Sequence, residues 1–113
     1  MVDIRTIREG DIEIILVSGE IDASSSIELD NAIKHAATEA SRILVDLQGL
    51  EYISSAGLGV FISYLEELKS KDIALVLYGM QAKVYEVFQI LGLQNLIMIT
   101  SNKEEAIGLL NEK

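Results

Sequence analysis

The chain has 113 residues, of which half are hydrophobic and about a quarter are charged, and its formal net charge is -9 at pH 7. This length fits one domain, predicted over residues 1–113, and the acidic balance disfavours nucleic acid and anionic membrane surfaces as partners. The sequence has no cysteine, which excludes disulfides, thiolate metal sites and cysteine nucleophiles.

Targeting and membrane signals are not seen in the sequence. The first eleven residues mix charged and short apolar side chains and have no apolar signal-peptide region. The longest apolar runs, such as IALVLY at residues 73–78, are far too short to span a bilayer. We therefore expect a cytoplasmic protein without direct membrane insertion.

The N-terminal part of the chain predicts a β-hairpin. Apolar and polar residues alternate in residues 4–7 and again in residues 12–16. The sequence Glu-Gly-Asp at residues 9–11 lies between them and is typical of a turn.

A helix and a buried strand are predicted next. Apolar residues recur at helical spacing in residues 24–40, and Ser25 with Glu28 forms a capping-box pattern at the start. The run RILVDL at residues 42–47 is typical of a strand that is buried on both faces.

The last third of the chain predicts alternating strands and helices. A buried strand, a helix, a short strand and a closing helix are expected at residues 73–78, 81–91, 96–100 and 104–113. The first of these helices has a stripe of Val84, Val87, Phe88 and Leu91, and Ser101 with Glu104 forms a second capping-box pattern. The order β-β-α-β-α-β-α-β-α predicts an α/β domain whose sheet is partly parallel, with about four helices packed on it.

The sequence YISSAGLGVFISYL, residues 52–65, lies between the predicted strands at residues 42–47 and 73–78. Helical spacing of apolar side chains predicts a helix that packs on the sheet through Leu58, Phe61, Ile62, Leu65 and Leu68. A brief loop is expected to connect it to the strand at residues 42–47. Ser54 and Ser55 therefore lie where this loop enters the helix.

The two serines admit a structural and a chemical interpretation. Serine is a favoured N-cap, and the first N–H groups of a helix also attract anions such as phosphate. Gly57 and Gly59 lack Cβ atoms, which suits either tight packing or the close approach of another molecule. A nucleophile elbow is not favoured, because Ile53 stands where that motif needs glycine and His35 is the only histidine.

Two segments resemble the STAS-domain family, which includes bacterial anti-sigma factor antagonists and the cytoplasmic domains of sulfate transporters. ILVDLQGLEYISSAGLGVFISYL, residues 43–65, resembles the family signature that contains Asp-Ser-Ser/Thr/Ala-Gly-Leu-Gly. VSGEIDASSSIELDNAI, residues 17–33, resembles its Gly-Glu-Leu-Asp loop and first helix. The resemblance implies a single STAS-like α/β domain with a mixed, mostly parallel sheet.

The resemblance also implies site residues. Ser55 takes the position of the phosphoacceptor, and Ser54 replaces the preceding aspartate and offers an alternative hydroxyl for modification. The partner-binding residues that the family pattern implies are Gly19, Glu20, Asp22, Ser54, Ser55, Gly57, Leu58 and Gly59.

The function that the resemblance implies is a regulatory switch without catalysis, metal or cofactor. The dephosphorylated protein would bind an anti-sigma factor that is also a serine kinase and so release the sigma factor. The kinase would phosphorylate Ser55, and a PP2C-type phosphatase would reverse this. One alternative is a STAS subunit of a larger assembly, such as a stressosome or a lipid-transport ATPase complex, without a phosphorylation switch. The other is a serine enzyme that uses Ser55.

Overall fold

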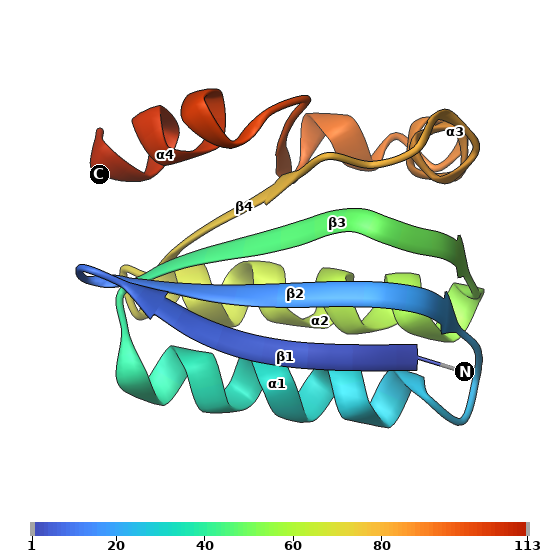
Figure 1. Ribbon diagram of the computed structural model, residues 1–113, viewed down its shortest axis with the longest axis horizontal. Helices are drawn as coiled ribbons and strands as arrows, with labels where there is room; N and C mark the ends of the chain where they lie inside the picture. The colour runs from blue at the N-terminus through green and yellow to red at the C-terminus, as the bar shows by residue number, and fades with distance from the viewer. Residues whose placement is uncertain (1, 113) are drawn as a thin grey trace.

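The computed structural model describes residues 2–112 and contains the predicted elements in the predicted order (Figure 1). The strands are β1 (Val2–Glu9), β2 (Ile12–Ile21), β3 (Arg42–Ile53), β4 (Ala74–Tyr78) and β5 (Met98–Thr100). The helices are α1 (Ser26–Glu39), α2 (Ser55–Ser70), α3 (Ala82–Ile90) and α4 (Lys103–Asn111), with a 3-10 turn at Leu93–Asn95.

The five strands form one sheet in the order β1-β2-β3-β4-β5. β1 is antiparallel to β2, and all other neighbours are parallel. Gly10 in the hairpin turn has a φ of +61°, which glycine adopts without strain. The predicted mixed, mostly parallel sheet is confirmed.

Helices cover the two faces of the sheet unequally (Figure 1). The main hydrophobic core joins α1, α2 and α3 to one face, where Phe61 of α2 contacts Phe88 of α3. On the other face a smaller core joins Ala106 and Leu110 of α4 to the sheet. α4 packs on β3, β4 and β5 and reaches β1 through the ion pair of Lys103 with Glu9, so most of the same face of β1 lies outside this packing.

β3 is longer than predicted. The expected brief loop before the junction helix is wrong, because β3 continues to Ile53 and pairs with β2 as far as Ile21. Pairing between β3 and β4 already ends at Asp46 and Tyr78. The ends of β2 and β3 therefore project beyond β4 and carry the start of α2.

The first predicted capping box is wrong. The hydroxyl of Ser25 makes no cap hydrogen bond to α1. It accepts instead from the N–H of Asp22 at 2.8 Å and lies 2.9 Å from Oδ1 of the same residue. A turn bond within the preceding loop thus replaces the cap.

The second predicted capping box is displaced by one residue. Asn102 is the N-cap of α4, and its Oδ1 accepts from the N–H of Glu105 at 2.9 Å. Its amide donates to Oε1 of Glu105 at 2.8 Å. Asn102 has the extended backbone that an N-cap requires, so the pair is Asn102 with Glu105 rather than Ser101 with Glu104.

Two residues expected on buried helix faces are exposed. Ile62 is 44% exposed, because the buried face of α2 is centred on Gly57, Phe61, Tyr64 and Leu68. Leu91 is 55% exposed, because α3 ends at Ile90 and the helical spacing stops there. Among residues 2–112, none of the helices could span a bilayer.

Candidate functional site

The two serines of the junction have different environments. Ser54 is the N-cap of α2, half-buried with extended backbone, and its Oγ accepts from the N–H of Gly57 at 3.3 Å. Ser55 is the first residue of α2, and its side chain is exposed. The hydroxyl of Ser54 is therefore engaged within the fold, whereas that of Ser55 is accessible.

The junction lies beside the loop of residues 19–22. The N–H of Ser54 donates to the carbonyl oxygen of Ile21 at 2.8 Å. The β2–β3 register also places Glu20 beside Tyr52 and Ile21 beside Ile53. The structure thus brings the two sequence motifs, more than thirty residues apart, to one end of the sheet.

Asp22 organises the loop that precedes α1. Its Oδ1 accepts from the N–H of Ser25 and the hydroxyl of Ser24, each at 2.9 Å. These bonds, with the backbone N–H of Ser25 first and the hydroxyls of Ser24 and Ser25 next, lower the pKa of Asp22 to about 2. Gly19 has a φ of +90°, a conformation that glycine permits where the strand leads into this loop.

Gly57 and Gly59 have different structural roles. A Cβ on Gly57 would lie 2.7 Å from Cγ1 of Ile53 and 2.8 Å from Cγ2 of Ile21. Gly57 and the neighbouring Leu58 are buried, so Gly57 serves close packing of α2 on β2 and β3. A Cβ on Gly59 would meet no atom within 4 Å, and Gly59 is exposed. Only Gly59 leaves open space for another molecule.

α2 also presents an exposed face that sequence spacing did not identify. Ser55, Gly59, Ile62 and Glu66 recur at intervals of three and four residues, so they share one side of the helix, and all four are exposed. Ile62 is the apolar member of this face. Ile62 is exposed because tertiary packing, and not sequence spacing, determines which face of α2 is buried.

The two segments that form the junction carry acidic but no basic side chains. Residues 43–68 contain no Lys or Arg, and neither do residues 9–33. Glu20, Asp22 and Glu51 are exposed at this end of the sheet. A phosphate on Ser55 would therefore meet the N-terminus of α2 but no cationic side chain of these segments.

A metal site and a histidine partner for the serines are two features that catalysis at this junction could use. Within residues 2–112, no group of three or more His, Cys, Asp or Glu side chains could hold a metal ion. His35 is exposed in the middle of α1, and no hydrogen bond between residues 2 and 112 joins it to Ser54 or Ser55.

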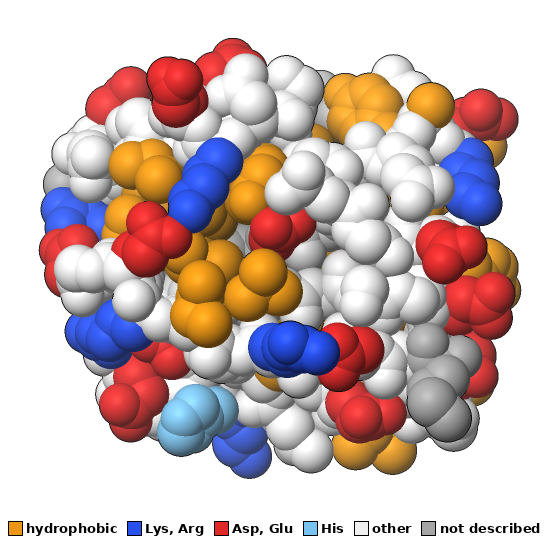
Figure 2. Space-filling model, viewed as in Figure 1, with side chains coloured by type: hydrophobic (Ala, Val, Ile, Leu, Met, Phe, Trp, Pro, Cys, Tyr) orange, Lys and Arg blue, Asp and Glu red, His pale blue; other side chains and the backbone are white. Residues whose placement is uncertain are grey.

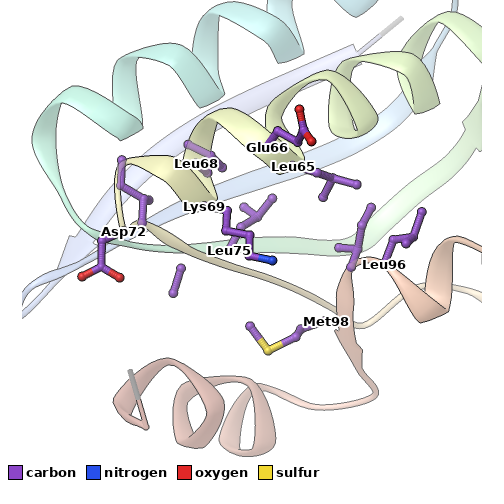
Figure 3. Close-up of a pocket in the computed structure, with 11 residues that line it drawn as sticks. Leu65, Glu66, Leu68, Lys69, Asp72, Leu75, Leu96 and Met98 are labelled. Atoms are coloured by element: carbon purple, nitrogen blue, oxygen red, sulfur yellow. The ribbon is translucent and has the colours of Figure 1, made fainter.

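A hollow of about 460 Å³ lies at the other end of α2 (Figure 3). Leu65 and Leu68 line one side of it, and Leu96 and Met98 line the other. Leu68 lies thirteen positions after Ser55 on α2, which is about 20 Å at a rise of 1.5 Å per residue. The hollow is therefore not part of the serine site.

The sequence model of the STAS-domain family matches residues 3–106 of this chain. The chain belongs to the STAS-domain family. The anti-sigma-B factor antagonist of Listeria monocytogenes is 33% identical over 95 residues, which cover 83% of each protein. The protein of the same name from Staphylococcus aureus is 30% identical over 91 residues, which cover 80% of this chain and 84% of the relative.

Solved structures share the fold of this STAS domain. An anti-sigma factor antagonist from Mycobacterium paratuberculosis has a TM-score of 0.90 at 19% identity and covers 98% of this chain, with 95% of its own chain covered. The unphosphorylated form of the anti-sigma factor antagonist SpoIIAA has a TM-score of 0.80 at 22% identity, with 98% of each chain covered.

Proposed function

We propose that this STAS domain is an anti-sigma factor antagonist switched by phosphorylation of Ser55. In the dephosphorylated state it binds an anti-sigma factor that is also a serine kinase, and a sigma factor is released. The observation that carries this proposal is the exposed Ser55 at the start of α2, beside the loop of residues 19–22. The names of the Listeria and Staphylococcus relatives support it.

The surface proposed for the partner combines both motifs. Glu20 and Asp22 supply acidic groups, and the exposed face of α2 supplies Ser55, Gly59 and Ile62. Gly57 and Leu58 are buried under this surface. They contribute to it indirectly, because their packing sets the position of α2. Ile62 adds an apolar contact to a face that is otherwise polar.

Phosphorylation changes this surface in charge and volume. A phosphate adds about -1.5 to -2 charge at pH 7, and neither motif segment has a Lys or Arg to pair with it. In the free protein, solvent and the N-terminus of α2 stabilise the phosphate. A partner that covers Ser55 has to desolvate the dianion, which weakens the complex. Each loss of about 1.4 kcal/mol lowers the affinity tenfold.

The geometry favours Ser55 over Ser54 as the acceptor. The hydroxyl of Ser54 caps α2 and is half-buried, so its modification would displace the cap. Aspartate and serine are both favoured N-caps, so Ser54 can cap α2 at the position where the family pattern has aspartate. What the replacement removes is a negative charge next to Ser55.

Phosphosite mapping tests the proposal. The purified protein is incubated with its cognate anti-sigma factor kinase, Mg²⁺ and ATP, and phosphate is located by mass spectrometry. We expect one phosphate, on Ser55, which the Ser55→Ala variant lacks and the Ser54→Ala variant retains. A PP2C-type phosphatase should remove it.

Two other outcomes would contradict the proposal. Phosphate on neither serine, with the kinase active on a control substrate, would favour a STAS subunit of a larger assembly that is not switched in this way. Labelling of wild type, but not of Ser55→Ala, by a fluorophosphonate probe would instead indicate a serine enzyme.

A further inference from the structure

The outer edge of β1 is the longest unpaired strand edge in the part of the chain that the structure describes. β1 forms one edge of the sheet, and each of its eight residues pairs with β2 in an unbroken register. β5, at the opposite edge, has three residues. A long regular edge presents backbone N–H and carbonyl groups to which another strand can bind.

β1 also differs from the rest of the chain in charge. Its sequence VDIRTIRE contains two acidic residues and two arginines, so its formal charge is zero, and the net charge of -9 lies on the other elements. Two copies of so acidic a chain repel each other over most of their surfaces. β1 is an element along which two copies can meet without that repulsion.

Four residues of β1 share the sheet face that α4 leaves largely uncovered: Asp3, Arg5, Ile7 and Glu9. Arg5, Ile7 and Glu9 alternate along the strand, opposite residues of β2 that belong to, or pack against, the smaller core. Ile7 is 47% exposed. Figure 2 shows hydrophobic side chains gathered on this face between α4 and the β1–β2 hairpin, beside charged side chains.

We propose that two copies of this chain associate through β1, in antiparallel pairing about a two-fold axis at Ile7. This register places Ile7 against Ile7 of the second copy. It also places Arg5 opposite Glu9 of the second copy, twice by symmetry and on the same face. Opposite charges and apolar side chains at directly facing positions stabilise antiparallel strands.

The charged groups that the pairing needs are accessible. Arg5 contacts Asp3 at 3.2 Å within its own strand, and the side chains of these two residues are 77% and 60% exposed. Glu9 pairs with Lys103 through Oε2, and its side chain is 47% exposed. Arg8 is on the other face, where it binds Glu13, and does not compete.

Neighbouring registers are less favourable. An axis at Arg5 places Arg5 against itself, and an axis at Thr6 places Asp3 against Glu9 of the second copy. An axis at Ile4 pairs Asp3 with Arg5 but leaves Ile7 beyond the paired part of β1. The register centred on Ile7 covers this side chain and pairs Arg5 with Glu9 within β1. The acidic pair that it creates, Asp3 with Asp11, involves a residue outside β1 that is already paired with Arg42.

Sedimentation equilibrium of wild type and charge variants tests the association. We expect wild type to form a reversible dimer at protein concentrations up to about 1 mM, because even a weakly bound dimer is populated in that range. Arg5→Glu should raise the dimer dissociation constant at least about tenfold, because it faces Glu9 of the second copy. The double variant Arg5→Glu/Glu9→Arg should restore dimerisation, whereas an axis at Ile4 predicts no rescue. The control Lys83→Glu makes the same change in net charge on the exposed surface of α3 and should have no such effect.

Cross-linking tests the register directly. The chain has no cysteine, so Ile7→Cys introduces the only thiol, and directly facing residues of antiparallel strands lie within disulfide distance. Ile7→Cys should form a disulfide dimer faster than the control Ile90→Cys, whose position on α3 is 75% exposed. A monomer at all concentrations, or equal cross-linking at both positions, would overturn the proposal. Neither result would affect the proposed phosphorylation switch, because β1 carries none of its site residues.

Discussion

The backbone N–H of Ser54 donates a hydrogen bond of 2.8 Å to the carbonyl oxygen of Ile21. Ser54 also caps α2 through its hydroxyl, so one residue connects the helix to the loop of residues 19–22. Ser55, the next residue, takes its position from both contacts. The proposed switch therefore depends on the packing of Ser54 as well as on the exposed hydroxyl of Ser55.

Ser54→Ala and Ser54→Asp separate the capping role of this residue from its charge. We expect Ser54→Ala to lower the free energy of unfolding by about 1 kcal/mol, because the N–H of Gly57 loses its acceptor. Ser54→Asp should retain wild-type stability, since aspartate is an equally good N-cap. Urea denaturation measures both, and equal stability of the three proteins would contradict the capping role.

Alanine substitutions at Gly57 and Gly59 form a matched pair on one helix. Both remove a helical glycine, so the difference between them isolates the contact of the new Cβ with its surroundings. The Cβ at position 57 overlaps Ile53 and Ile21, whereas position 59 is open. We expect Gly57→Ala to be less stable than Gly59→Ala by about 1–3 kcal/mol in denaturant unfolding. Equal stabilities would show that Gly57 does not serve close packing.

Acid should weaken the contribution of Asp22 to stability. The pKa of Asp22 is about 2 in the folded protein, against about 4 in an unfolded chain. The lowered pKa means that its contribution is fully present above about pH 4 and is lost as the pH falls toward 2. The stability difference between wild type and Asp22→Asn should shrink over this interval. A carboxyl titration by NMR with a midpoint near 4 would contradict the hydrogen-bonded loop.

Ile62→Asp tests the proposed partner surface on α2. Because Ile62 is 44% exposed, the substitution should leave the unfolding free energy almost unchanged. Calorimetric titration with the cognate anti-sigma factor kinase should show at least about tenfold weaker binding, since a charge replaces an apolar contact. The control is Ile90→Asp, which changes an exposed isoleucine at the end of α3. If both variants bind like wild type, the partner does not cover this face of α2.

The fold could be predicted because its main strands and helices have simple patterns. The inner strands carry continuous apolar runs, such as Ile43, Leu44 and Val45, and the helices have apolar stripes between polar residues. The end of β3 could not be predicted in this way. Residues 48–52 include polar residues and a glycine, and they are a strand because β2 pairs with them.

Details at the helix ends depended on backbone geometry. Asn102 and Ser101 are adjacent polar residues, and the extended conformation of Asn102 decides which of them is the cap. The sequence pattern also fitted either Ser54 or Ser55 as the N-cap of α2, and in the structure the N-cap is Ser54. The family resemblance placed residues 19–22 and the junction in one set of partner-binding residues. No local pattern predicts their contact, because the two segments are distant in the sequence.

Whether Ser55 is a switch is decided by the affinity of the cognate anti-sigma factor kinase for the phosphorylated protein and for the unphosphorylated protein. Stoichiometrically phosphorylated protein and its phosphatase-treated form would be compared by calorimetric titration in one buffer, with Ser55→Ala as the unmodifiable control. We predict at least about tenfold weaker binding after phosphorylation, a difference of about 1.4 kcal/mol or more, and wild-type affinity after phosphatase treatment. Equal affinity of the two forms would contradict the switch at Ser55.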